Sequence, residues 1–188
     1  MAPVKRELKF FENEIQRNTA AAELLFSSAD KALQESRQFL FVLSGGHTPL
    51  KFYQLLAARL SKDKICRDNI HFFFSDERMV PPDNYQSNYY NADELLFKNL
   101  EMNEKYIHRI KGELSTAESA SEDYEKHLKK FFNLTEEGFP VFDLILSGLG
   151  KDGHTASLFP GNQEVCENRR WVIPVAHPEA EPFIPRVS

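Results

Sequence analysis

Three short apolar runs, each ended at once by glycine or polar residues, limit most strongly what this chain can fold into. They are 39–43 (FLFVL), 70–74 (IHFFF) and 141–146 (VFDLIL). Continuous apolar runs of this length are typical of strands buried on both faces. Segments with helical spacing lie at 13–36, 50–60, 88–96 and 116–132. This alternation predicts an α/β fold, a doubly wound and mostly parallel sheet with helices on both faces.

Several weaker signals complete the outline. Further strands are predicted at 106–110 and 171–175, and a short helix from about His154. Ser115 and Glu118 have the spacing of a capping box for the helix at 116–132, and Thr48 can cap the helix at 50–60. The last residues, 186–188, look like the opening of another strand. We therefore expect the C-terminal part of the domain to lie outside this sequence.

Composition excludes several classes of protein. The 188 residues are 41% hydrophobic, which suits one globular domain over 1–188. No signal peptide and no run of about 18 apolar residues is present, so neither export nor a membrane span is expected. Cys66 and Cys166 have no metal-ligand spacing and fit a reduced, cytoplasmic protein. The net charge is −5 and basic pairs are isolated, so no nucleic-acid partner is expected.

The turn SGGHTP at 44–49 follows the first apolar run and precedes a helix. Successive backbone amides at the start of a helix can cradle an anion, and the helix dipole adds to this attraction. The alternative is an ordinary turn between strand and helix, in which the glycines only allow the backbone to bend and no ligand binds. A nucleotide P-loop is disfavoured because the lysine of that motif is missing.

The third apolar run leads into a second glycine-rich turn that carries Asp152 and His154. Ligands of open α/β sheets bind beyond the carboxyl ends of the strands, so both side chains are expected to face the cleft. Gly148, Gly150 and Gly153 also satisfy the dinucleotide pattern G-x-G-x-x-G. That pattern requires an acidic residue about 20 positions later, and Arg169 with its neighbours stands there instead.

Asp76, Glu77 and Arg78 follow the second apolar run. Such a cluster is by default a solvated surface, but its place at the same sheet edge as the two glycine turns favours a functional role. The remaining histidines suggest no role by pattern, and His71, inside a strand, is expected to be structural. His154 differs, because a neutral imidazole presented at a cleft is suited to general-base catalysis.

Three segments together resemble a known family. They are SGGHTP at 44–49, SDERMVPPDNYQSNY at 75–89 and GLGKDGHTASLFPG at 148–161. In combination they are similar to the 6-phosphogluconolactonases, and more distantly to the glucosamine-6-phosphate deaminases/isomerases of the same fold. The resemblance covers essentially the whole chain. It implies hydrolysis of 6-phospho-D-glucono-1,5-lactone to 6-phosphogluconate, in the oxidative pentose phosphate pathway, with no metal and no cofactor.

The resemblance also assigns site residues. It implies phosphate binding by Ser44, Gly45, Gly46, Thr48 and Arg186, a general base at His154, and an arginine at Arg78 that steadies the reacting carbonyl. We add Asp152 as a residue that orients the imidazole, and Asp76 and Gly150 as substrate-binding residues. Amides of the turn at 148–153 are a second candidate for stabilising the oxyanion. A monomer or a weak homo-oligomer is expected.

Two alternatives remain at this point. The deaminases/isomerases resemble this chain in their D-G-H turn but continue with a glutamate that moves protons, and Phe159 stands at the corresponding place here. Phenylalanine cannot transfer a proton, so the lactonase is favoured. The other alternative is a sugar-phosphate sensor without catalysis. Sensors of that kind usually carry a DNA-binding segment, and no basic helix-turn-helix is evident.

Overall fold

The computed structural model describes residues 6–134, 138–176 and 183–188. Its centre is a parallel sheet in which β1 (Phe39–Leu43) pairs with β2 (Ile70–Phe74) along its whole length. On the far side of β2 lies β4 (Ile107–His108), and on the far side of β1 lies β5 (Leu144–Ile145). The order β4-β2-β1-β5 reverses direction between β1 and β5. A crevice at such a reversal is where open α/β sheets bind ligands.

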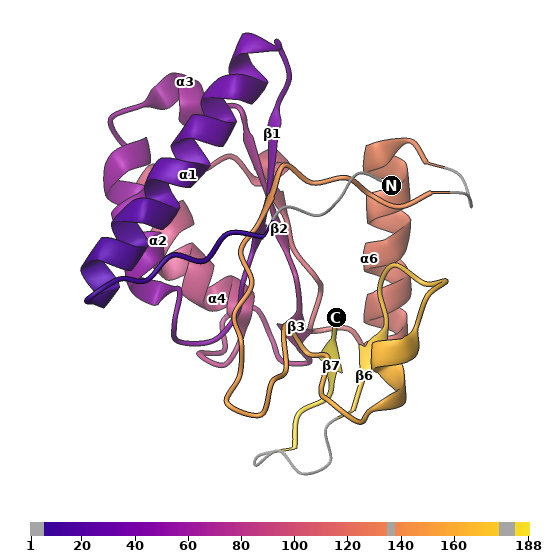
Figure 1. The fold of residues 1–188 in the computed structure, drawn as a ribbon. Helices are drawn as coiled ribbons and strands as arrows, with labels where there is room; N and C mark the ends of the chain where they lie inside the picture. Colours follow the sequence, from indigo (N-terminus) through magenta and orange to yellow (C-terminus); the bar gives the residue numbers. More distant parts are fainter. Residues whose placement is uncertain (1–5, 135–137, 177–182) are drawn as a thin grey trace.

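Helices cover both faces of this sheet, as predicted (Figure 1). On one side lie α1 (Glu14–Gln34), α2 (Leu50–Leu60) and α3 (Lys64–Arg67), and on the other lies α6 (Ala117–Phe132). A continuous helical segment runs through α4 (Asn88–Ala92), a π-helical turn (Asp93–Phe97) and α5 (Lys98–Leu100). It is followed by a 3-10 turn at Glu104–Tyr106. No helix in the described ranges is long and apolar enough to cross a membrane.

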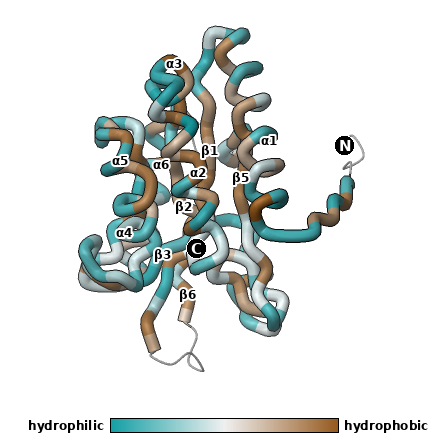
Figure 2. The backbone as a smooth tube through the Cα atoms, turned by 90° about the vertical axis from the view of Figure 1, so that its left-hand side faces the viewer, coloured by the Kyte–Doolittle hydropathy of each residue, from teal (hydrophilic) through white to brown (hydrophobic). Residues whose placement is uncertain are grey.

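The core is rich in phenylalanine because β1 carries phenylalanines on one face and β2 carries aromatic residues on both. Phe41 and Phe72 are fully buried and meet edge to face, with ring centroids 6.1 Å apart. All five residues of β2 are buried. Figure 2 shows hydrophobic residues along β1 and hydrophilic residues around α4 and β3. The first two apolar runs thus become buried strands for the reason expected from their sequence.

A second, antiparallel sheet stands at the carboxyl end of the first. It consists of β3 (Glu77–Arg78), β7 (Arg186–Val187) and β6 (Pro174–Val175), in the order β3-β7-β6. Because β3 follows directly after β2, this small sheet brings the last described residues beside the ends of the parallel strands (Figure 1). The strand predicted at 186–188 is therefore confirmed in part.

Three local predictions were wrong. The run at 141–146 forms only the short edge strand β5, and Val141 and Ile145 are exposed. The segment from His154 forms turns, and a 3-10 helix appears later, at Gln163–Cys166. The strand predicted at 171–175 is reduced to β6.

The predicted caps also differ. Thr116 caps α6, and Ser119 completes the capping box in place of the pair Ser115 and Glu118. Thr48 does not cap α2, because Pro49 occupies the N-cap position and no side-chain bond forms there. Thr116 and Ser119 lie three positions apart, as do Ser115 and Glu118, so the two possible capping boxes differ by only one position in the sequence.

Candidate functional site

Three loops meet beyond the carboxyl ends of β1, β2 and β5 and enclose a pocket of about 160 Å³. They are the two predicted glycine turns and the acidic-basic segment after β2. The pocket also receives one residue of β7. Of the predicted site residues, these line it: Ser44, Gly45, Gly46, Thr48, Asp76, Arg78, Gly150, His154 and Arg186. Asp152 stands just behind, in contact with His154. The structure therefore brings all of the predicted site residues together.

The turn after β1 presents backbone amides to the pocket. Ser44 is buried, and its carbonyl accepts a hydrogen bond from the hydroxyl of buried Tyr53. Burial raises the pKa of Tyr53, so this hydroxyl stays a donor at neutral pH. Within the described residues, no protein group accepts a hydrogen bond from the amides of Gly45, His47 or Thr48. Amides that lack an internal partner are suited to hold an anion.

Two arginines lie side by side in the same pocket. The antiparallel register pairs Arg78 of β3 with Arg186 of β7. Both Nε atoms are buried and make no hydrogen bond within the described residues, and neither side chain forms an ion pair there. Burial, together with the charge of Arg78, lowers the pKa of Arg186. Asp76 of the same pocket opposes this lowering, but it forms no ion pair with either arginine among the described residues. Two adjacent cations that are not paired with a carboxylate form a site for an anionic ligand.

His154 is held by Asp152. Its Nδ1 lies 2.6 Å from Oδ1 of Asp152, and the same oxygen accepts a hydrogen bond of 3.2 Å from the backbone amide of His154. The contact with His154 lowers the pKa of Asp152, which is therefore an acceptor at neutral pH. Nδ1 of the neutral ring must then carry the hydrogen, which leaves Nε2 able to take up a proton.

Gly150 is required by this close pair. A Cβ at that position would lie 2.2 Å from Nδ1 of His154 and 2.5 Å from Oδ1 of Asp152, so no other residue fits without displacing them. The amide of Gly150 donates to the carbonyl of His154 at 2.8 Å, and the amide of Gly153 donates to Gly150. Both amides already donate hydrogen bonds within the turn. They are therefore weaker candidates for stabilising an oxyanion than the sequence suggested.

The acidic residues after β2 have separate places. Asp76 lines the pocket although it is 4% exposed, and its Oδ2 accepts a hydrogen bond of 2.6 Å from Ser157. Glu77 is 2% exposed and accepts hydrogen bonds from the amides of Arg78, Asn88 and Tyr89 and from the hydroxyl of Ser87. It therefore caps the start of α4 and is not a solvated surface charge.

Sequence reasoning missed Asn88 and Ser157, which are buried beside the site. Asn88 stands in the quoted segment 75–89, but that sequence pattern predicts a helix there and nothing more. Of the other histidines, His47 lines the pocket and His71 is buried in β2. His177 lies outside the described residues.

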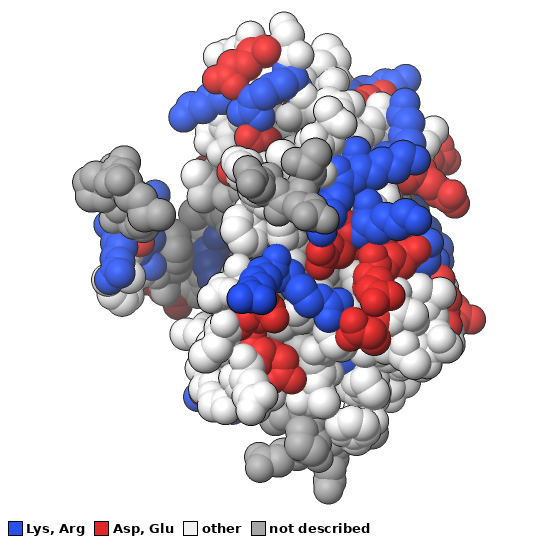
Figure 3. Space-filling model, turned by 90° about the vertical axis from the view of Figure 1, so that its right-hand side faces the viewer, with Lys and Arg blue, Asp and Glu red and all other residues white. Residues whose placement is uncertain are grey.

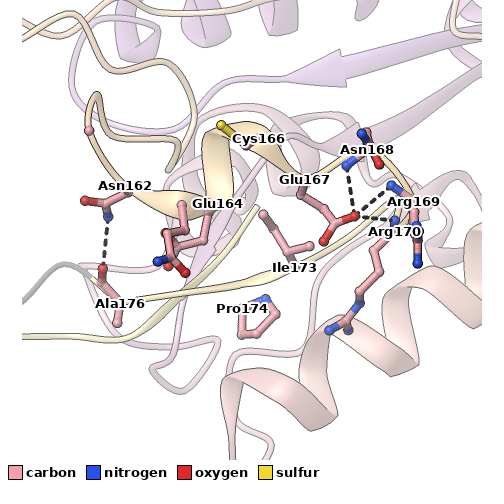
Figure 4. Close-up of a pocket in the computed structure, with 12 residues that line it drawn as sticks. Asn162, Glu164, Cys166, Glu167, Asn168, Arg169, Arg170, Ile173, Pro174 and Ala176 are labelled. Atoms are coloured by element: carbon pink, nitrogen blue, oxygen red, sulfur yellow. Dashed lines mark hydrogen bonds between the residues drawn. The ribbon is translucent and has the colours of Figure 1, made fainter.

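A larger and more open hollow of about 900 Å³ lies between the 3-10 helix at Gln163–Cys166 and β6 (Figure 4). None of the predicted site residues lines it. Its carboxylate Glu167 is occupied by the backbone amides of residues 168–170, which lowers the pKa of Glu167. On the face carrying α6, charges of both signs are interspersed (Figure 3), with ion pairs such as Lys129–Glu125. Among the described residues, no cluster of His, Cys, Asp or Glu is arranged to hold a metal.

A sequence model described as "Glucosamine-6-phosphate isomerases/6-phosphogluconolactonase" matches residues 12–188. The chain belongs to this family. It is 32% identical over 181 residues to the 6-phosphogluconolactonase of a Nostoc species, which covers 96% of the chain and 73% of that relative. It is 34% identical over 166 residues to the 6-phosphogluconolactonase of Thermotoga maritima, covering 88% of the chain and 69% of that relative.

Solved structures of family members show the same fold. The 6-phosphogluconolactonase of Trypanosoma cruzi superposes with a TM-score of 0.85 at 29% identity, over 98% of this chain and 74% of its own. That of Thermotoga maritima gives a TM-score of 0.75 at 34% identity, over 91% of this chain and 72% of its own. A monomeric glucosamine-6-phosphate deaminase gives a TM-score of 0.72 at 18% identity, which supports the fold alone.

Proposed function

We propose that this chain hydrolyses 6-phospho-D-glucono-1,5-lactone to 6-phosphogluconate, the reaction of the oxidative pentose phosphate pathway after which its relatives are named. One observation carries the proposal. His154, which Asp152 contacts, lines the same pocket as the arginine pair of Arg78 and Arg186. A phosphorylated lactone needs both features, a cationic site for its phosphate and a base beside its ring ester.

The phosphate end is bound by the loop amides and by Arg186. Charge-assisted hydrogen bonds contribute about 1.5–3 kcal/mol each, so a few suffice to hold a phosphate on a protein whose net charge is −5. The guanidinium of Arg186 lies over the ring of Phe159, with Cζ 5.4 Å from the centroid, which limits the positions it can adopt. This end of the site supplies binding and orientation.

Hydrolysis begins when Nε2 of His154 takes a proton from water as the water oxygen attacks C1. A positioned general base contributes about 10²- to 10⁴-fold in rate. The negative carbonyl oxygen is stabilised by Arg78, whose Nη1 is fixed on the carbonyl of Gln86 at 2.6 Å. The bond from C1 to the ring oxygen then breaks, and the imidazolium returns its proton to that oxygen. Asp152 holds the ring in place and stabilises its charged form.

The deaminase alternative finds less support at this site. Phe159 is 5% exposed and packs against the ring of His154, with centroids 4.8 Å apart. A phenyl ring has no proton to give during opening of an amino sugar. The side chain serves here as an apolar support for the base.

The experiment that tests the proposal follows acid release from freshly generated 6-phosphogluconolactone, with glucosamine 6-phosphate assayed in parallel for released ammonia. We expect lactone hydrolysis well above the spontaneous rate and no ammonia. Ammonia release without lactone hydrolysis would show that the chain is a deaminase and not a lactonase. Tight binding of 6-phosphogluconate without turnover of either compound would favour the sensor.

We further propose that the chain acts in the cytoplasm as a monomer or weak homo-oligomer. Its two cysteines, buried Cys66 and exposed Cys166, are both free thiols, as a reducing compartment would keep them. Light scattering across a concentration series tests the assembly state.

A further inference from the structure

We propose that Asn88 is a positioning residue that fixes the amide loop at Gly45 and Gly46 relative to Asp76, and thereby sets where the phosphate end of the substrate lies. The inference rests on the proposed function and deepens it. Asn88 is 3% exposed and belongs to the first turn of α4, outside the three loops that line the pocket. It acts through its neighbours.

The side-chain amide of Asn88 joins two of the site's loops. Its Oδ1 accepts a hydrogen bond of 3.4 Å from the amide of Gly46. Its Nδ2 donates to the carbonyl of Asp76 at 2.9 Å and to Oδ1 of Asp76 at 3.1 Å. A carbonyl accepts only and an amide N–H donates only, so these partners fix which end of the side chain faces which loop.

The backbone of Asn88 is fixed as well. Its amide donates to Oε1 of Glu77 at 2.7 Å, and Glu77 also accepts from the next amide of the helix. The start of α4 is therefore tied to β3 by a buried carboxylate. Because the backbone of Asn88 is held in place, its side chain contacts Gly46 in a fixed position, as a positioning role requires.

Gly45 shows how closely the loop approaches this side chain. A Cβ at Gly45 would lie 2.3 Å from Nδ2 and 2.4 Å from Oδ1 of Asn88. The amide cannot easily move aside because it is buried and bonded to Asp76 and Gly46. Position 45 therefore requires glycine, because any side chain there would collide with Asn88.

The connection continues to the loop of the base. The other carboxylate oxygen of Asp76 accepts the hydroxyl of Ser157, which is fully buried two residues beyond Thr155. A buried path therefore runs from Gly46 through Asn88, Asp76 and Ser157 to the segment that carries His154. Such a path holds the amide loop at a fixed position relative to that segment.

The test measures steady-state kinetics with 6-phosphogluconolactone for Asn88→Ala, Gly45→Ala and the double variant. We expect each single change to raise KM about 10-fold or more and to leave kcat within about 3-fold, because binding of the phosphate end is lost while the base is kept. In the double variant the smaller residue at 88 makes room for the methyl group at 45. Its KM should therefore be no worse than that of the poorer single variant.

Asn91→Ala is the matched control. Asn91 lies one turn further along, outside the pocket, and its side chain donates to the carbonyls of Tyr85 and Ser87. A KM for Asn88→Ala equal to that of Asn91→Ala would overturn the proposal, and so would fully additive effects in the double variant. A fall in kcat at unchanged KM would overturn it as well.

A second readout separates this inference from the proposed function. Hydrogen exchange of the Gly46 amide should be faster in Asn88→Ala than in the wild type and unchanged in Asn91→Ala, whether or not the chain turns over a lactone. If Asn88→Ala does not fold, Gly45→Ala alone decides through the same two measurements. An inactive wild type whose Gly46 amide responds in this way would refute the lactonase and leave the positioning role standing.

Discussion

At the scale of single residues, the site brings together charged groups that each depend on a ligand or a neighbour. Asp152 contacts His154, whereas Arg78 and Arg186 lie on paired strands and, among the described residues, neither forms an ion pair; the charge of Asp76 acts on Arg186 without direct contact. Desolvation of an unpaired charge is unfavourable to folding. We infer that this arrangement is kept for binding and not for stability.

This inference predicts opposite effects on stability and on binding. Arg186→Met should preserve or raise the free energy of unfolding, by about 1 kcal/mol, because a half-buried cation beside Arg78 is replaced by an apolar chain of similar length. The same change should raise KM for the phosphorylated lactone about 10-fold or more. Urea denaturation and initial rates measure the two quantities. Arg169→Met, at an exposed arginine outside the pocket, is the control. A marked loss of stability at unchanged KM would contradict the assignment.

At the scale of elements, the central strands could be predicted and the loop geometry could not. β1 and β2 were predicted at their observed bounds, because continuous apolar runs leave few alternatives. The helix expected from His154 fails because Ala156 adopts a positive φ of 50° and Ser157 turns inward to Asp76. The contact of Ser157 depends on a partner 81 positions away in sequence. Local pattern carries no information about such a contact.

The pairing of β3 with β7 shows the same limit. The sequence placed Arg78 after a strand and Arg186 at the opening of another, but their register is set by the tertiary fold. The resemblance to the family nevertheless predicted both residues, because members of the family share the fold that brings them together. The buried helpers Asn88 and Ser157 have no chemical signature of their own, so only the structure identifies them.

Glu77 gives a prediction for the helix that begins at α4. Glu77→Gln should lower the free energy of unfolding by about 2–4 kcal/mol, because one oxygen that accepts two buried donors becomes an NH2 group that cannot accept. Glu94→Gln is the control, since Glu94 is exposed and pairs with Lys98 at the surface, where ion pairs contribute about 1 kcal/mol or less. Urea midpoints and slopes provide the comparison. Equal losses in the two variants would show that Glu77 is not a buried cap.

At the scale of the whole molecule, a chain of three histidines links the sheet to α6. Nδ1 of His71 lies 2.7 Å from Nε2 of His108, and Nδ1 of His108 lies 2.8 Å from Nε2 of His127. Burial lowers the pKa of all three, that of His108 to about 3. Lys105, Lys111 and Lys130 add to this effect, and Asp123 near His127 opposes it. The folded protein therefore keeps these rings neutral where the unfolded chain would protonate them.

The sign of the pH dependence follows. A depressed pKa in the folded state stabilises the protein above the unfolded value of about 6.5, and that stability is lost as the pH falls. Between pH 7.5 and 5.5, His108 alone should reduce the free energy of unfolding by about 1.4 kcal/mol. Urea titrations at both pH values measure the loss, and His108→Gln should reduce it by a similar amount. An identical loss in the variant would rule out His108 as its source.

The most direct measurement of the central claim compares kcat and KM for hydrolysis of 6-phosphogluconolactone by the wild type and by His154→Ala. The imidazole is held by Asp152 in the same pocket as the phosphate site, so its removal should lower kcat about 100-fold or more. KM should change little, because the amide loop and Arg186 remain in place. A variant that hydrolyses the lactone at nearly the wild-type rate would contradict the account.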